Sequence, residues 1–206
     1  MSEQIALPLR TGKGPARIVL GTGNRHVAEA LTTPENWPFR TAVITGPPRS
    51  GKSLFARWFA ESGPGHVQRE MVDDAHRLPE DALFHRWNRA QENGVALLII
   101  GGEPPWKITL PDLASRLGGS LQLAIGPPDD ESARDLLLSL AEERGLPLRD
   151  DAADYLIPRA TRSYAEIEAL VATIDRLSLE RKAPPNLGIW RAALDAVHGP
   201  EEPRLL

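Results

Sequence analysis

The feature that most restricts the fold of this chain is a glycine-rich segment between a strand pattern and a helix pattern. Residues 40–45 (RTAVIT) form a short, β-branched apolar run, which is typical of a buried strand. Residues 53–61 (SLFARWFAE) place apolar side chains at helical spacing. The junction follows the pattern G-x-x-x-x-G-K-S and consists of Gly46, Pro47, Pro48, Arg49, Ser50, Gly51, Lys52 and Ser53. A strand, such a loop and a helix in this order predict a phosphate-binding loop in an α/β fold.

The chemistry of this loop predicts a nucleotide cofactor. Glycines let successive backbone N–H groups face a phosphate, and the following helix adds its positive end. Lys52 would reach the β- and γ-phosphates, and the Ser53 hydroxyl would hold Mg²⁺. We therefore expect ADP or ATP together with Mg²⁺ at residues 46–53.

Two consecutive carboxylates close the next strand pattern. Asp73 and Asp74 follow residues 67–72. In a P-loop protein, one carboxylate at this place holds Mg²⁺ through water and a second polarises the attacking water. We assign Asp73 to the metal and Asp74 to catalysis, and the alternative is a solvated loop pair or a helix cap.

The remaining patterns predict two structural units. Further strand patterns cover residues 95–100 and 121–125, and helical patterns cover residues 24–31, 81–91 and 110–117. After Gly126-Pro127-Pro128 only helical patterns follow, at residues 129–144, 151–159 and 163–180. Strands that alternate with helices indicate a parallel sheet, and trailing helices indicate a separate bundle. We expect a flexible tail over residues 1–15, an α/β nucleotide-binding domain over 16–127 and a helical domain over 128–206.

Composition narrows the classes of partner. The net charge is −4, and a DNA-binding protein usually has a basic excess, so we expect no direct sequence-specific DNA binding. The chain has no cysteine and its five histidines do not cluster, which argues against a metal site other than nucleotide-bound Mg²⁺. No apolar run is long enough to span a bilayer, and the first residues are no secretory signal. We therefore expect a cytoplasmic protein.

Several stretches resemble one branch of the AAA+ proteins. Asp73-Asp74-Ala75-His76 and the helix pattern ALFHRWN resemble that family's Walker B strand and the helix after it. The other matching stretches are Pro104-Pro105, residues 110–117 (LPDLASRL), residues 4–9 (QIALPL) and residues 164–168 (YAEIE). In this order they are similar to the DnaA/Hda family. The resemblance implies an AAA+ P-loop fold with a shortened parallel sheet flanked by helices, followed by a small all-α lid domain.

The resemblance also implies roles for two segments outside the P-loop. Arg116 in LPDLASRL would be an arginine finger that acts in trans on the nucleotide of a neighbouring protomer. From residue type alone, an ordinary surface arginine is the alternative. The first segment would bind the DNA polymerase III sliding clamp (the beta subunit) through Gln4, Ile5, Leu7, Pro8 and Leu9. A disordered terminus with scattered apolar residues is the alternative there.

Three departures from the family pattern bear on mechanism: the first argues against origin melting by this chain, and the other two point to weak hydrolysis by the chain itself. Lys52 and Asp73 lie only 21 positions apart (73 − 52), whereas the family usually fits a further strand and helix between them. Gly101-Gly102 stands where the initiator has a polar Ser-Asp sensor, and Ala165 stands at the lid arginine that reads the γ-phosphate. Arg162 would replace that arginine only if the helix is rotated.

The function that the resemblance implies is that of a regulatory adaptor. Such a protein binds the clamp, docks on DnaA and promotes hydrolysis of DnaA-bound ATP, which negatively regulates replication initiation. The alternatives are a stand-alone P-loop ATPase, a helicase-loader-like AAA+ protein, and a paralogue that recruits something other than DnaA. The sequence leaves open whether the chain forms a homodimer.

Overall fold

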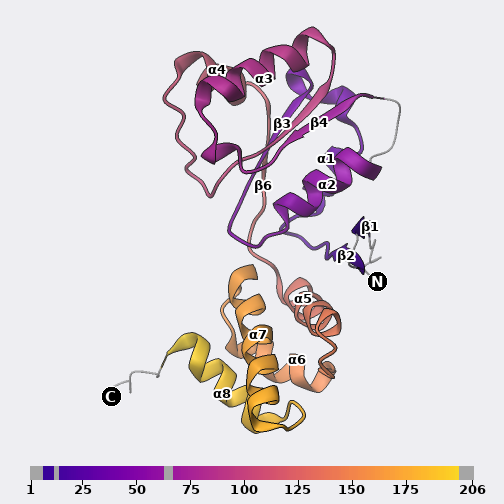
Figure 1. The fold of residues 1–206 in the computed structure, drawn as a ribbon, viewed down its shortest axis with the longest axis vertical. Coiled ribbons are helices and arrows are strands. Elements are labelled where there is room, and N and C mark those ends of the chain that lie inside the picture. The colour runs from indigo at the N-terminus through magenta and orange to yellow at the C-terminus, as the bar shows by residue number, and fades with distance from the viewer. Residues whose placement is uncertain (1–6, 12–13, 63–66, 200–206) are drawn as a thin grey trace. The chain divides into compact units, whose positions relative to one another are not determined.

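The computed structural model describes residues 7–11, 14–62 and 67–199, and the chain divides into two units. The first unit is Met1–Gly126 and the second is Pro127–Leu206 (Figure 1). Each unit has its own core, so each is described separately.

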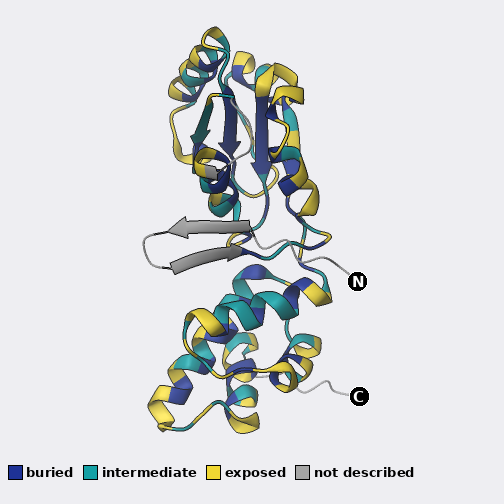
Figure 2. Ribbon diagram, turned by 90° about the vertical axis from the view of Figure 1, so that its right-hand side faces the viewer, coloured by how far each residue is buried: buried dark blue, intermediate teal, exposed yellow. Residues whose placement is uncertain are grey.

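The centre of the first unit is a parallel sheet with the strand order β4-β5-β3-β6. Its strands are β3 (Thr41–Thr45), β4 (Arg69–Val72), β5 (Ala96–Ile100) and β6 (Leu121–Ala124). Every residue of β5 is buried, as its unbroken apolar sequence predicts for an inner strand of a parallel sheet. Figure 2 shows these buried strands between layers of helices. The predicted α/β fold with a short parallel sheet is confirmed.

Helices connect the strands and cover the sheet. They are α1 (Arg25–Leu31), α2 (Lys52–Ser62), α3 (Glu80–Glu92) and α4 (Pro111–Gly118), with short 3-10 turns at Pro34–Asn36, Pro38–Arg40 and Ala75–Arg77. Leu83 and Trp87 of α3 lie in one apolar core with Leu113 and Leu117 of α4. The carboxyl ends of β3, β4 and β5 meet at one edge of the sheet, because all three run in parallel.

The beginning of the chain differs from the predicted flexible tail. Residues Leu7–Thr11 (β1) and Gly14–Ile18 (β2) pair antiparallel, from Leu7 opposite Ile18 to Thr11 opposite Gly14. A hairpin satisfies the backbone N–H and C=O groups that a free tail would leave to water. The sequence reading gave weight to scattered apolar residues and missed this pairing.

The second unit contains only helices among its described residues. They are α5 (Asp130–Glu143), α6 (Asp150–Leu156), a 3-10 turn at Ile157–Arg159, α7 (Tyr164–Arg181) and α8 (Leu187–His198). The sequence analysis missed α8. Its signal is Asn186 after Pro184-Pro185, because the Asn186 side chain accepts hydrogen bonds from the N–H groups of Gly188 and Ile189.

The helix starts in this unit use different caps from one another. The Asp129 carboxylate accepts a hydrogen bond from the Ser132 N–H at 2.7 Å and caps α5. Ser163, the N-cap residue of α7, makes no side-chain cap bond. Instead Glu166 reaches back and accepts from the Thr161 N–H at 2.7 Å. None of the helices in the described parts of the chain is both long and apolar enough to cross a membrane.

Candidate nucleotide and arginine sites

The P-loop backbone takes conformations that only its glycines fit easily. Gly46 has φ +154°, and a Cβ there would lie 2.9 Å from the Ile125 Cβ. Gly51 has φ +83°, in the left-handed region that favours glycine. Between them, Arg49 also has a positive φ of 63°. The sequence therefore places its two motif glycines where the loop must turn sharply.

Lys52 points back into this loop. Its Nζ donates hydrogen bonds to the carbonyl oxygens of Gly46 and Pro47 at 2.8 and 2.7 Å. Burial lowers the pKa of Lys52 from its ordinary 10.5, and the nearby carboxylates of Glu103, Asp73 and Asp74 act against that shift. A partly buried ammonium at the loop is suited to meet an anionic ligand.

The two residues expected to hold Mg²⁺ lie together. The Ser53 hydroxyl at the start of α2 donates to Asp73 Oδ1 at 3.1 Å, across 20 positions of sequence. Asp73 also accepts from the backbone N–H of Asp74 at 2.9 Å, and Asp74 itself has φ +49° and an exposed side chain. A hydroxyl and a carboxylate beside a phosphate loop match the oxygen ligands that Mg²⁺ prefers.

The Ser50 hydroxyl of the loop has no hydrogen-bond partner among the residues that the structure describes. The Ser50 hydroxyl is buried without a hydrogen bond, and Ser50 is only 4% exposed. Buried hydroxyls are normally satisfied, so this atom fits a loop that completes its hydrogen bonds with a ligand. No cluster of three His, Asp or Glu side chains that could hold a metal by itself occurs in the described ranges. The residues present therefore fit a phosphate group that brings Mg²⁺ with it.

Two glycines follow β5, and aromatic rings from other segments pack on them. A Cβ on Gly101 would lie 2.5 Å from Trp106 Cε3 and 3.1 Å from Thr45 Cγ2, so the indole covers this glycine closely. A Cβ on Gly102 would lie 3.2 Å from the His76 ring. Trp106 is partly buried. Sequence reasoning missed Glu103, whose carboxylate acts on Lys52.

Arg116 does not extend freely from α4. Its guanidinium lies over the Trp87 ring at 4.5 Å and over the Phe84 ring at 4.9 Å, both on α3. Such cation–π contacts hold a planar guanidinium in one orientation. The expected finger is thus a partly buried, aromatic-supported arginine.

The contacts of Arg162 bear on whether it replaces the lid arginine that is missing at Ala165. Arg162 forms an ion pair with Asp130 at 2.9 Å, and both side chains are largely exposed. Ala165 stands in the first turn of α7 and has no polar side chain. Arg162 would have to leave Asp130 before it could take over the role of the missing arginine.

Three of the five predicted clamp-binding residues lie within the described part of the chain, in β1. Gln4 and Ile5 lie outside the described residues. Leu7, Pro8 and Leu9 belong to β1 and pair with Ile18, Arg17 and Ala16 in that order.

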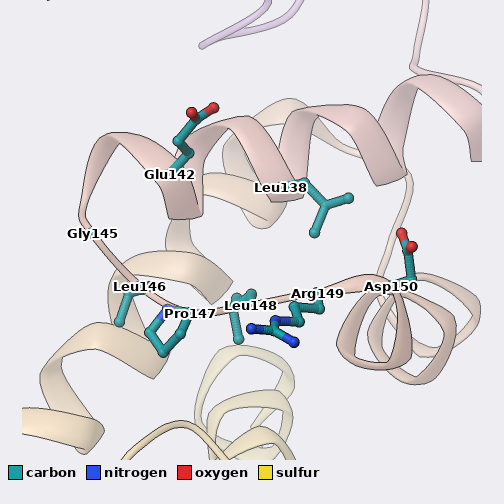
Figure 3. A pocket seen from close by; sticks show the side chains of 8 residues that line it. All are labelled: Leu138, Glu142, Gly145, Leu146, Pro147, Leu148, Arg149 and Asp150. Atoms are coloured by element: carbon teal, nitrogen blue, oxygen red, sulfur yellow. The ribbon is translucent and has the colours of Figure 1, made fainter.

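The second unit also has an open hollow of about 570 Å³ between the end of α5 and the start of α6 (Figure 3). Leu138, Leu146 and Leu148 supply its apolar lining, and Glu142, Arg149 and Asp150 lie at its border. None of the residues assigned to a site from the sequence lines this hollow.

Known proteins match this chain in two ways, through a family model of the second unit and through solved structures that cover most of the chain. Residues 130–184 match the family described as "Hda, lid domain". Domain III of the Thermotoga maritima replication initiation protein DnaA superposes with a TM-score of 0.69 at 16% identity, over 88% of this chain and 95% of that one.

Two further solved structures have similar folds. A replication initiator DnaA bound to AMPPCP and single-stranded DNA has a TM-score of 0.60 at 20% identity, over 79% of this chain and 65% of that one. The Thermotoga maritima RuvB Holliday junction branch migration motor has a TM-score of 0.60 at 16% identity, over 86% and 70% of the two chains. This chain thus spans about two thirds of these longer proteins.

Proposed function

We propose that this chain, which matches the Hda lid domain over residues 130–184 and has the fold of DnaA domain III, is a regulatory adaptor of the DnaA/Hda type. It binds a nucleotide, docks on DnaA·ATP at the DNA-loaded sliding clamp, and presents Arg116 to the DnaA-bound nucleotide. The result is faster hydrolysis of that ATP and negative regulation of replication initiation. The observation that carries the proposal is the match of the lid to Hda, joined to a complete P-loop in the first unit.

The P-loop geometry supports ADP or ATP with Mg²⁺ as the ligand of this chain. The unpaired Ser50 hydroxyl, the Lys52 ammonium and the Ser53–Asp73 pair lie at the carboxyl edge of the sheet. The bound phosphates would give the Lys52 ammonium an anionic partner, and Mg²⁺ would neutralise the oxygens beside Ser53 and Asp73. A solved DnaA relative binds AMPPCP on the same fold.

The β5 edge favours a structural rather than a hydrolytic role for this nucleotide. Gly101 and Gly102 offer no side chain to position an attacking water, and an indole and an imidazole ring pack on them. Asp74 is the carboxylate left for that task, and it is exposed. We therefore propose slow intrinsic hydrolysis, with DnaA as the protein in which the chemistry occurs.

Arg116 would supply charge stabilisation to a nucleotide held by another protein. A finger supplied in trans raises phosphoryl-transfer rates by about 10³–10⁵-fold. Binding to the clamp through Gln4, Ile5, Leu7, Pro8 and Leu9 would raise the local concentration of this chain near DnaA.

The test is ATP hydrolysis by DnaA·ATP with the clamp loaded on DNA. Wild type should accelerate hydrolysis, and Arg116→Ala should lose at least about 10³-fold of the stimulated rate, because the developing phosphate charge is no longer neutralised. Arg176→Ala is the matched control, since Arg176 pairs with Glu180 on the surface of α7. The same assay without clamp, or with Gln4→Ala/Ile5→Ala, should show a loss that a higher protein concentration overcomes.

Two results would count against the proposal. No stimulation by wild type at any concentration would leave a nucleotide-binding AAA+ fold without this activity. Stimulation that survives Arg116→Ala would remove the arginine from the mechanism.

A further inference from the structure

A carboxylate on α3 binds the beginning of α4, the helix that carries Arg116. Glu80 Oε1 accepts from the Thr109 N–H at 2.9 Å, and Oε2 accepts from the same N–H at 3.1 Å. Oε2 also accepts from the Thr109 hydroxyl at 2.8 Å and from the Leu110 N–H at 2.6 Å. Leu110 is the N-cap residue of α4, so Glu80 is bound to the helix start from another helix.

One of these bonds satisfies a group that α4 cannot satisfy itself, the N–H of its N-cap residue Leu110, and the others hold Thr109 just before the helix. The first N–H groups of a helix have no intrahelical partner, and they carry its positive end. The residues before α4 provide no side-chain cap of their own. The bonds from Thr109 and Leu110 to this carboxylate are charge-assisted, so they hold the chain at the entry to α4 more firmly than bonds to a neutral side chain would.

The same helix, α3, also binds the far part of α4. The rings of Phe84 and Trp87 lie about one and two helical turns beyond Glu80 and support the Arg116 guanidinium. Between these contacts, Leu113 is fully buried against the shared core. Figure 1 shows α3 and α4 side by side. One neighbouring helix, α3, therefore contacts α4 both at its start and at Arg116, and these two contacts fix where the guanidinium lies.

We propose that Glu80 is a positioning residue for Arg116: it fixes the start of α4 so that the guanidinium rests on Trp87 and Phe84 in the orientation that a partner's nucleotide meets. The proposal rests on the proposed function for its effect on hydrolysis. Its structural half does not, because it concerns only the contacts of Arg116 within this chain. Small misplacements of a catalytic group cost large factors in rate, so a rigid support has a kinetic consequence.

The structural half is tested by NMR of the Arg116 side chain. Ring currents of Trp87 and Phe84 should displace the Arg116 Hε resonance from the ordinary arginine range, and Arg116→Lys assigns it. Glu80→Ala should move this resonance back toward that range, whereas Glu80→Gln, which keeps one acceptor oxygen, should move it less. Glu92→Ala, an exposed glutamate at the other end of α3, is the control and should leave it in place. An unmoved resonance in folded Glu80→Ala overturns the proposal.

The kinetic half uses the stimulation assay with the full protein, clamp and DnaA·ATP. Glu80→Ala should lower the maximal stimulated rate by about 10- to 100-fold while the half-saturating concentration stays within about twofold. Glu80→Gln should recover part of the rate. In an Arg116→Ala background, Glu80→Ala should cause no further loss, which general destabilisation would not reproduce.

The outcomes separate the two proposals. If wild type stimulates and Arg116→Ala does not, but Glu80→Ala keeps the full maximal rate, the positioning role is wrong and the adaptor function stands. If wild type itself gives no stimulation, the adaptor function fails and the NMR comparison alone decides the role of Glu80.

Discussion

Two charged side chains, Lys52 at the carboxyl edge of the sheet and Glu80 between α3 and α4, respond in opposite ways to their surroundings: the charged form of Lys52 is disfavoured and that of Glu80 is favoured. At the edge, burial lowers the pKa of Lys52, so the charged ammonium is penalised in the protein alone. Between α3 and α4, hydrogen bonds from Thr109 and Leu110 lower the pKa of Glu80, so its charged form is favoured. The Lys52 ammonium is thus suited to receive an anion from outside, whereas the Glu80 carboxylate already has its hydrogen-bond donors within the chain.

The largest expected effect is on ligand-dependent stability at the edge. ADP with Mg²⁺ at 100 times its Kd should raise the free energy of unfolding of wild type by about 2.7 kcal/mol. Lys52→Ala should abolish most of that rise, because the phosphates lose their fixed cation. The measurement is thermal denaturation of both proteins with and without ADP, and Lys107→Ala serves as a control at an exposed lysine.

The apo proteins make this comparison sharper. Since the Lys52 charge is penalised without ligand, Lys52→Ala should change the apo melting temperature far less than it changes the ADP effect. Equal melting temperatures of wild type with and without saturating ADP would show that the edge does not receive a nucleotide, and the contrast with the helix pair would be lost.

A smaller effect is expected where the indole covers β5. Gly101→Ala should destabilise the first unit by about 1–3 kcal/mol, because the new Cβ overpacks against Trp106 and Thr45. Urea unfolding should show that Gly101→Ala costs much less in a Trp106→Ala background than in wild type, since the atoms nearest to the new Cβ belong to the Trp106 ring. Gly118→Ala is a control of opposite sign: a Cβ at Gly118 would meet no described atom within 4 Å outside its own helix backbone and chain neighbours, and alanine favours a helix by up to about 1 kcal/mol.

Sequence patterns predicted most of the first unit because its strands and motif are local signals. Residues 40–45 and 95–100 are apolar runs that end at glycine, and the P-loop lies between a strand and a helix as its chemistry requires. In the second unit, α8 escaped notice because two prolines separate it from α7, although Asn186 marks its start.

The contacts of the candidate site could not be predicted in the same way. Glu80 binds Thr109 across 29 positions of sequence, and no periodicity records such a pair. Arg116 was assigned as a finger from its surrounding motif, but its support by Trp87 depends on how two helices pack. Side-chain partners that are distant in sequence follow from the fold and not from the local pattern.

The smallest expected effect is the acid sensitivity of the α3–α4 pair. A carboxyl group with a folded pKa below its ordinary 4.5 binds protons less readily in the folded state than in the unfolded state. Its stabilising contribution is complete above about pH 4.5 and is lost as the pH falls through the lower folded value. Wild type should therefore be more stable than Glu80→Gln at pH 7, and chemical denaturation should show the difference narrowing between about pH 5 and pH 3.

Glu92→Gln, at an exposed site on the same helix, should show no such convergence. A constant difference between wild type and Glu80→Gln across this range would mean that the charge of Glu80 does not hold α4. The helix pair would then depend on its apolar core, with Leu113 and Leu117, and on the aromatic support of Arg116 alone.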